Sequence, residues 1–260
     1  MVMNRVFLTA FAAVVALAAE PAMGADMGAP AYKAPSPPPM PVYSWTGFYL
    51  NLGGGYGLWD ANVATTNLDG SCTVVTAACA TQTLGGRGYF GTGGGGYDYQ
   101  FNDRIVIGVQ ADYDFMHLKG TIEDNSAPAV VGPLNETSAW AAGVRAGWLM
   151  APQFLTYFNG GVTGTRFGGT TLNLNTGGGP LGATQAFTQT GWFIGGGTET
   201  TLTPFLPAGW FLRSEYRYSS FGNEAITQTI SGAPINIINF KPYVQTLSTS
   251  ILYKFNWFDH

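Results

Sequence analysis

The chain has 260 residues, a net charge of −4 and 10% charged residues, against roughly 25% in an average soluble domain. These charges are too few to cover a water-facing surface, yet the mean hydropathy is close to zero, and the abundance of glycine and aromatic residues is typical of strands that alternate between lipid and a lumen. The slight acidity argues against nucleic acid as a partner, because that function requires a basic patch.

The first predicted element is an export signal at residues 1–24. One positive charge in MVMNR precedes the apolar run VFLTAFAAVVALAA, and Ala22-Met23-Gly24 offers a small-x-small cleavage site before Ala25. The alternative is a membrane anchor helix, but the run is shorter than the roughly 18–20 residues needed to span. The mature chain is therefore expected to be exported, and either to stay soluble or to enter an outer membrane.

A proline-rich segment at residues 25–44 follows the signal. Proline occupies positions 30, 35, 37, 38, 39 and 41. Because proline cannot take part in helix or sheet hydrogen bonding at such density, the segment is expected to be an extended periplasmic tether. The barrel domain is then expected to span residues 45–260.

From Trp45 onward, segments alternate apolar residues with polar residues or glycine, the pattern of a β-strand with one apolar face. Ile107 and Val109, for example, share a face opposite that of Gly108 and Asp112. Only residues 154–167 leave the phase of the alternation open. The eight predicted strands are 45–58, 93–101, 104–115, 138–150, 154–167, 187–200, 209–219 and 244–255.

Short and long connections alternate between these strands. Tight turns are expected around Asn102-Asp103, Ala151-Pro152 and residues 204–207. Long polar loops are expected at residues 58–87, 118–137, 167–187 and 219–242. Short turns at one end and long loops at the other are typical of outer-membrane barrels, and loops of that length are unusual in a compact soluble domain. The predicted fold is all-β: an eight-stranded antiparallel up-and-down transmembrane β-barrel.

An even number of strands places both termini on the short-turn side, which is expected to be periplasmic, with the long loops outside the cell. The apolar faces are then expected to contact lipid. The aromatic residues fit two interfacial girdles. One is expected to comprise Tyr97, Tyr99, Phe101, Trp148, Trp210 and Phe255, and the other Tyr56, Tyr113, Phe115, Trp140, Trp192 and Tyr218.

Charged residues of both signs fall on the inward phase of the strands. They are Asp98, Asp112, Asp114, Arg145, Glu199, Arg213, Glu215, Arg217 and Lys254. Charges in a narrow lumen are expected to pair, because an unpaired buried charge is costly, and the turn at 204–207 should bring Glu199 opposite Arg213. Such a network either fills the barrel or gates small ions. The interior of an eight-stranded barrel is just wide enough for its side chains, which favours a plug with at most a narrow, low-conductance path.

Cys72 and Cys79, the only cysteines, lie in the loop-like stretch DGSCTVVTAACATQ. In an oxidising compartment they are expected to form a small disulfide-closed loop, and free thiols are the alternative. Two cysteines without a nearby histidine are too few ligands for a metal site. No metal or cofactor is expected.

Two further patterns carry little functional signal. Residues 86–91 match G-x-G-x-x-G, but a strand rather than a helix follows, so the dinucleotide-binding interpretation is set aside. His117 lies past Asp112 and Asp114, near the rim where some barrel enzymes hold their active sites. A nucleophile and an orienting partner would also be required, so an enzyme is not expected and a solvated rim histidine is the alternative.

In this arrangement the chain resembles the small outer-membrane β-barrel family of Gram-negative bacteria, known as outer membrane immunogenic or porin-family proteins and similar to the transmembrane domain of outer membrane protein A. The resemblance covers nearly the whole mature chain. The motifs that carry it are WTGFYLNLGGGYG at Trp45, GGGGYDYQF at Gly93, VIGVQADY at Val106, GVRAGW at Gly143, GWFIGGGTE at Gly191, SEYRYSSFG at Ser214 and LYKFNW at Leu252.

The resemblance implies a barrel exposed at the cell surface, with membrane lipid, lipopolysaccharide and the barrel-assembly machinery as its partners. One departure concerns the C-terminus: barrels commonly end on an aromatic residue that the assembly machinery reads, and here five residues follow Phe255. The expected function is a structural surface barrel, with weak pore formation left open. The alternatives are an adhesin that binds through its long loops and, third, a barrel enzyme that depends on His117.

Overall fold

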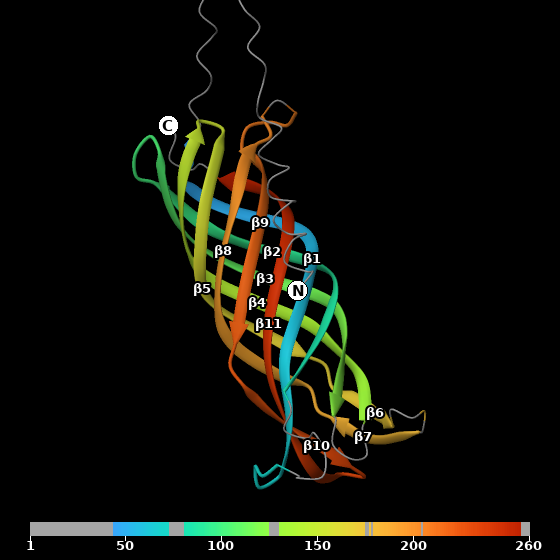
Figure 1. Cartoon of the computed structure of the whole chain (residues 1–260). Helices are drawn as coiled ribbons and strands as arrows, with labels where there is room; N and C mark the ends of the chain where they lie inside the picture. The colour runs from blue at the N-terminus through green and yellow to red at the C-terminus, as the bar shows by residue number, and fades with distance from the viewer. Residues whose placement is uncertain are drawn as a thin grey trace, which may run out of the picture. The chain divides into compact units, whose positions relative to one another are not determined.

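A computed structural model describes residues 44–72, 81–124, 130–174, 177, 179–203 and 205–255 (Figure 1). The regular elements of these residues are antiparallel strands. No helix in this part of the chain is long and apolar enough to cross a membrane. The strands are β1 (Gly47–Asn67), β2 (Gln82–Gln100), β3 (Ile105–Asp124), β4 (Val130–Ala151), β5 (Phe154–Phe167), β6 (Thr170–Leu174), β7 (Pro180–Thr184), β8 (Phe187–Thr201), β9 (Trp210–Phe221), β10 (Glu224–Ile230) and β11 (Ala233–Phe255).

These elements build one closed barrel of eight strands. The ring runs β1-β2-β3-β4-β5-β8-β9-β11, and β1 closes it by pairing with β11. The remaining three elements extend strands of the ring after two-residue interruptions: β6 extends β5 past Gly168-Gly169, β7 leads into β8 through Gln185-Ala186, and β10 extends β9 past Gly222-Asn223. The predicted eight-stranded antiparallel barrel is therefore confirmed.

The strands are much longer than the sequence analysis predicted. β1 has 21 residues and β11 has 23, whereas a tilted strand needs only about 9–11 to cross a membrane. The expected long loops at 58–87, 118–137, 167–187 and 219–242 are wrong in this respect, because strands continue through most of them. We call one part of the barrel the near half: it contains the short turns, the start of β1 and the end of β11. The part of each strand beyond about Leu58 and Phe115 is the far half.

In the near half, apolar side chains point outward. On β1, Phe48, Leu50 and Leu52 are exposed on the outer wall while Tyr49 is buried inside. The predicted facing of residues 104–115 is confirmed, since Ile107 and Val109 are exposed and Val106 is buried. On β5, the burial of the side chains settles the phase that the sequence left open: Phe158 is exposed, and its neighbours Tyr157 and Asn159 face the lumen.

In the far half, the alternation is reversed. On β1, Trp59, Ala61 and Val63 point inward and are fully buried, while Asp60 and Asn62 are exposed. The other uninterrupted strands follow the same rule; on β3, Leu118 and Ile122 are buried. This half has a polar outer wall and an apolar interior, as a water-soluble barrel has. The polar residues of this outer wall give these segments the composition of long polar loops.

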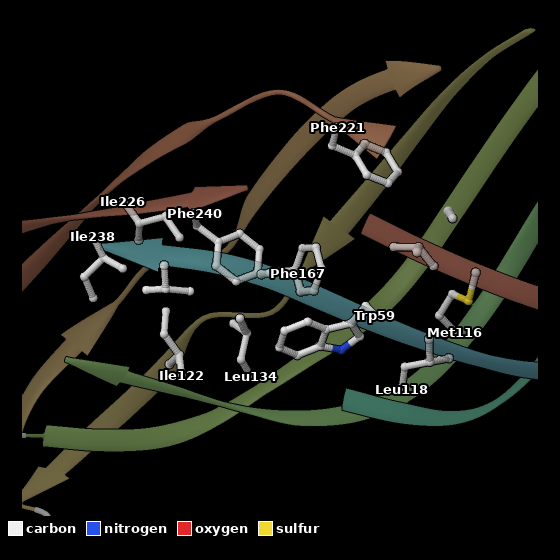
Figure 2. Close-up of a cluster of buried hydrophobic side chains, with 14 of the residues drawn as sticks. Trp59, Met116, Leu118, Ile122, Leu134, Phe167, Phe221, Ile226, Ile238 and Phe240 are labelled. Carbon is white, nitrogen blue, oxygen red and sulfur yellow. The ribbon is translucent and has the colours of Figure 1, made fainter. Parts of the chain in front are cut away.

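The interior of the far half is an aromatic and aliphatic core (Figure 2). The Trp59 ring packs edge-on against the rings of Phe167 and Phe240, with centroids 5.5 and 5.8 Å apart. Gly86 and Gly120 leave room for the Trp59 indole, because a Cβ atom at either position would collide with it. The first glycine of the G-x-G-x-x-G match therefore lies within a strand and accommodates a core side chain.

Candidate functional site: the barrel lumen

The lumen of the near half begins at an apolar cap. Trp45 is fully buried; its backbone N–H donates to Gln100 Oε1 at 3.0 Å and its indole N–H to the Pro152 carbonyl at 3.2 Å. These bonds hold the indole across the barrel mouth, where it packs against Phe211 with ring centroids 4.9 Å apart. Further buried residues complete this cap: Tyr49, Val106, Leu149, Leu155, Tyr157 and Leu252.

A five-residue ion cluster lies among these buried side chains. Glu199 forms ion pairs with three cations: Arg145, Arg213 at 2.6 Å and Lys254 at 3.2 Å. Asp98 forms ion pairs with Arg145 and, at 2.8 Å, with Lys254. The cluster joins β2, β4, β8, β9 and β11 across the lumen. The predicted register of Glu199 opposite Arg213 is confirmed.

Aromatic rings surround the cations of this cluster. The Arg145 guanidinium lies 5.0 Å from the Tyr49 ring centroid and 4.9 Å from that of Tyr157, and Lys254 Nζ lies 4.5 Å from the Trp45 ring. Cation–π attraction is strongest where water is excluded. These aromatic partners were not predicted from the sequence, although the inward phase of Tyr49 between Phe48 and Leu50 indicates one of them.

A second ion cluster lies beside the first. Both terminal nitrogens of Arg217 donate to the Asp112 carboxylate, at 2.7 and 2.8 Å, and Nη2 also donates to Glu215 Oε1. Glu215 Oε2 accepts from Tyr157 Oη at 2.7 Å and from Asn159 Nδ2 at 2.9 Å. The Tyr157 hydroxyl thus connects the second cluster to the aromatic shell of the first.

Asp114 and Glu136 stand apart from these ion pairs. Both are buried, but no salt bridge joins either to a cation within the described ranges. Thr165 Oγ1 donates to Glu136 Oε1 at 2.6 Å. Glu136 was missed because it lies in a predicted loop and because a bulge near Ser138 shifts the strand phase. The structure therefore brings eight of the nine predicted lumen charges into two clusters and leaves Asp114 outside them.

The other predicted site residues do not extend this network. His117 is exposed on the outer wall, 5.3 Å from the Tyr89 ring, whereas Asp112 and Asp114 face the lumen. The imidazole of His117 therefore lies on the opposite side of the wall from these two carboxylates and does not form a catalytic pair with them. In the part of the chain that the structure describes, no group of three metal-ligating side chains forms.

The predicted disulfide cannot be placed in full, because Cys79 lies outside the described residues. Cys72 follows a turn in which Ser71 donates its backbone N–H and hydroxyl to Asp69 Oδ1, at 2.9 and 2.6 Å. This turn directs the chain toward Cys72 at the far end of β1. The Cys72–Cys79 bond stays a prediction, as do the signal at 1–24 and the tether, which also precede the described residues.

An antiparallel barrel with an apolar outer band and a charged interior defines the class of transmembrane β-barrels found in outer membranes. The chain belongs to the outer membrane protein beta-barrel domain family, whose model matches residues 7–255. This match confirms the resemblance drawn from the sequence and makes the chain an outer-membrane protein.

Individual proteins are also similar to the chain. The chain is 25% identical to the 31 kDa outer-membrane immunogenic protein of Brucella melitensis, over 94% of this chain and 98% of the relative, and equally to that of Brucella suis. Among solved structures it is similar to Neisserial surface protein A (18% identity, TM-score 0.39, 81% of this chain and 98% of that one). It is also similar to OprG of Pseudomonas aeruginosa (11% identity, TM-score 0.45, 81% and 97%).

Proposed function

We propose that this protein is a structural, surface-exposed outer-membrane barrel whose lumen is closed. The observation that carries the proposal is the filling of the barrel by its own side chains. Trp45 covers the near mouth, two ion clusters cross the middle, and the core around Trp59 fills the far half. An ion crossing this barrel would have to displace all three layers.

The orientation follows from the same proposal. The far half, with its polar outer wall, is the part that suits water outside the cell, and the short turns then lie in the periplasm with both termini. The apolar outer wall of the near half contacts membrane lipid, and the far half stands above it among lipopolysaccharide. The assembly machinery inserts the barrel from the periplasmic side.

Planar-bilayer recording tests closure of the lumen. Protein refolded into lipid should give no current steps, or at most rare steps of low conductance. Insertion is verified in the same sample by protease protection of the near half, so that an absence of current cannot be attributed to failed insertion. Stable steps as large as those of a water-filled porin would overturn the proposal.

Binding through the outer connections is the second candidate function. The observation that favours it is the length of the far half, which raises the four connections above the membrane on a packed core. The fourth connection, Ser231-Gly232, is already a short turn, so the test exchanges residues 68–81, 125–129 and 175–179 for Gly/Ser turns. Adhesion of whole cells to a host surface should fall for at least one of the three exchanges, and unchanged adhesion in all three would eliminate this candidate.

A further inference from the structure

The wall of the far half has a seam between β7/β8 on one side and β9/β10 on the other. The β8–β9 ladder ends at Gly191–Phe221, and β7 and β10 then share a single residue pair, Ala183–Thr229. Residues 185–190 and 222–228 are all described, and no ladder pair joins these two stretches. The barrel is therefore closed there by a single pair, whereas β1 and β11 pair without interruption.

The β6–β7 hairpin borders this seam and has few attachments of its own. It pairs with β4 only at Val130–Leu174 and Val131–Asn173, and with β10 only at Ala183–Thr229. Pro133, two residues after the last of these β4 pairs, has no N–H to donate to a ladder. The interruptions at Gly168-Gly169 and Gln185-Ala186 flank the hairpin. We call the two strands β6 and β7 together the flap.

Side chains rather than backbone ladders cross the seam. From β8, Gln189 Nε2 donates to the Phe240 carbonyl on β11 at 3.3 Å. From β10, the Gln228 amide reaches the flap, where its Nε2 lies 3.5 Å from the place a Cβ atom would occupy at Gly182. The glutamines therefore approach the seam from opposite sides.

Three oxygen atoms at this seam lack hydrogen-bond partners among the described residues. They are Thr184 Oγ1, Gln189 Oε1 and Gln228 Oε1. Their side chains are buried, with residue exposures of 6%, 5% and 2%. Buried polar atoms are nearly always satisfied, so three unpartnered oxygens on the strands that border one seam require an explanation. The two glutamine oxygens can only accept a hydrogen bond, and the threonine hydroxyl can also accept one, so a donor suits all three.

The surface beneath the flap is apolar. Leu172 of β6 is fully buried, and the Phe167 and Phe187 rings stack with centroids 5.3 Å apart. Phe240 lies against both of these rings, at 5.3 and 5.6 Å. Figure 2 shows Phe167 and Phe240 side by side in this core. A molecule that enters at the seam meets acceptors at the wall and aromatic rings behind them.

We propose that the flap covers a binding site for a small amphipathic molecule with an apolar body and one hydrogen-bond donor, such as an alkanol. The donor satisfies the acceptors of Gln228, Gln189 or Thr184, and the apolar body packs against Phe167, Phe187 and Phe240. Entry requires the flap to part from β10 at the Ala183–Thr229 pair. This site is lateral, and its occupation leaves the ion clusters of the near half in place.

Two isomers, 1-hexanol and methyl pentyl ether, isolate the role of the donor, because only the alcohol has one. Each is titrated into protein in lipid nanodiscs while the NMR signal of the Trp59 indole N–H, which lies in the core, is followed. We expect a saturable shift with hexanol and a Kd for the ether weaker by about fivefold or more, the effect of one hydrogen bond. Absence of saturable binding, or equal affinity for both isomers, would refute the site.

The flap itself is tested by a reversible cross-link. Ala183→Cys with Thr229→Cys, made in a chain with Cys72→Ser and Cys79→Ser, joins the flap to β10 when oxidised. Hexanol binding should disappear on oxidation and return on reduction, within one folded protein. Undiminished binding by the oxidised protein would overturn the role of the flap.

Two control variants accompany this test. Asn62→Cys with Lys241→Cys places a cross-link at a β1–β11 pair on the outer wall, and hexanol binding should be unaffected by its oxidation. Gln228→Leu removes one acceptor, so hexanol affinity should fall toward that of the ether. Retention of the full preference for hexanol would exclude Gln228 as its partner.

Discussion

The near and far halves of this barrel use the same strands with opposite facing. On β11, Ile251 of the near half is exposed on the outer wall, whereas Ile238 of the far half is fully buried inside. The difference shows that a two-residue alternation alone does not specify whether the apolar residues of a strand face the lumen or the outside. The medium around the wall decides it: lipid favours apolar residues on the outer wall, and water favours them in the interior. The following predictions test this contrast in order of decreasing effect.

The largest effect is expected for the ion cluster of the near half. Glu199→Gln removes the shared partner of Arg145, Arg213 and Lys254, and unpairing buried charges costs about 3–5 kcal/mol. Adding Arg213→Gln should recover part of the loss, because it removes one unpaired cation. Urea unfolding in lipid vesicles measures the double-mutant cycle. A coupling of zero would contradict the pairing of Glu199 with Arg213.

The second-largest effect is expected when a charged residue is introduced on the outer wall, because the loss of stability should differ between the two halves. Ile107→Arg in the near half should cost about 2–4 kcal/mol if the site lies near the bilayer midplane. Thr121→Arg, on the exposed wall of the far half of the same strand, should change stability by less than about 0.5 kcal/mol. Vesicle unfolding curves compare the two. If Ile107→Arg is tolerated and Gly108→Arg is not, the assigned facing is inverted.

A single methyl group should distinguish the halves on β11. Ile238→Val should cost about 0.5–1.5 kcal/mol, as in the core of a soluble protein. Ile251→Val should cost less, because lipid chains fill the space left by the methyl group. The two urea midpoints, measured in the same vesicles, provide the comparison. A larger loss for Ile251→Val would contradict a packed core in the far half.

The smallest effect is expected beyond the far end of β1. Cys72→Ser should leave the unfolding midpoint of the barrel unchanged, because the expected disulfide closes only a short connection. Mass spectrometry of protein from intact outer membranes should find Cys72 and Cys79 joined. Two alkylatable thiols in that sample would refute the bond.

The sequence was sufficient to predict the near half. Strict alternation in residues 104–115 identified a strand and its outward face, and the inward phase of Asp98, Arg145 and Glu199 identified the lumen charges. Both predictions required only local periodicity. The position of Glu199 opposite Arg213 followed from counting outward from a short turn, which transmits register reliably over a few residues.

The far half required information that local periodicity does not contain. The stretch WDANVATTN alternates as well as any predicted strand, but it is polar enough to be predicted as part of a loop, because local periodicity does not distinguish a polar outer wall from a polar connection. The bulge near Ser138 and the interruption at Gly168-Gly169 depend on pairing between distant strands. Trp45 crosses the mouth through bonds to Gln100 and Pro152, which are remote in sequence.

The reversed alternation also constrains biogenesis. In the proposed orientation, the far half must pass through the hydrocarbon layer before it reaches water, and its outer wall carries Asp60, Lys119 and Lys241. A charge held at the bilayer midplane costs about 2–4 kcal/mol for Arg or Lys, so these residues oppose translocation of each hairpin. The core around Trp59 also takes strands from the whole ring. It can therefore form only after the last hairpin has crossed, which makes packing of the far half a late step that traps the inserted barrel.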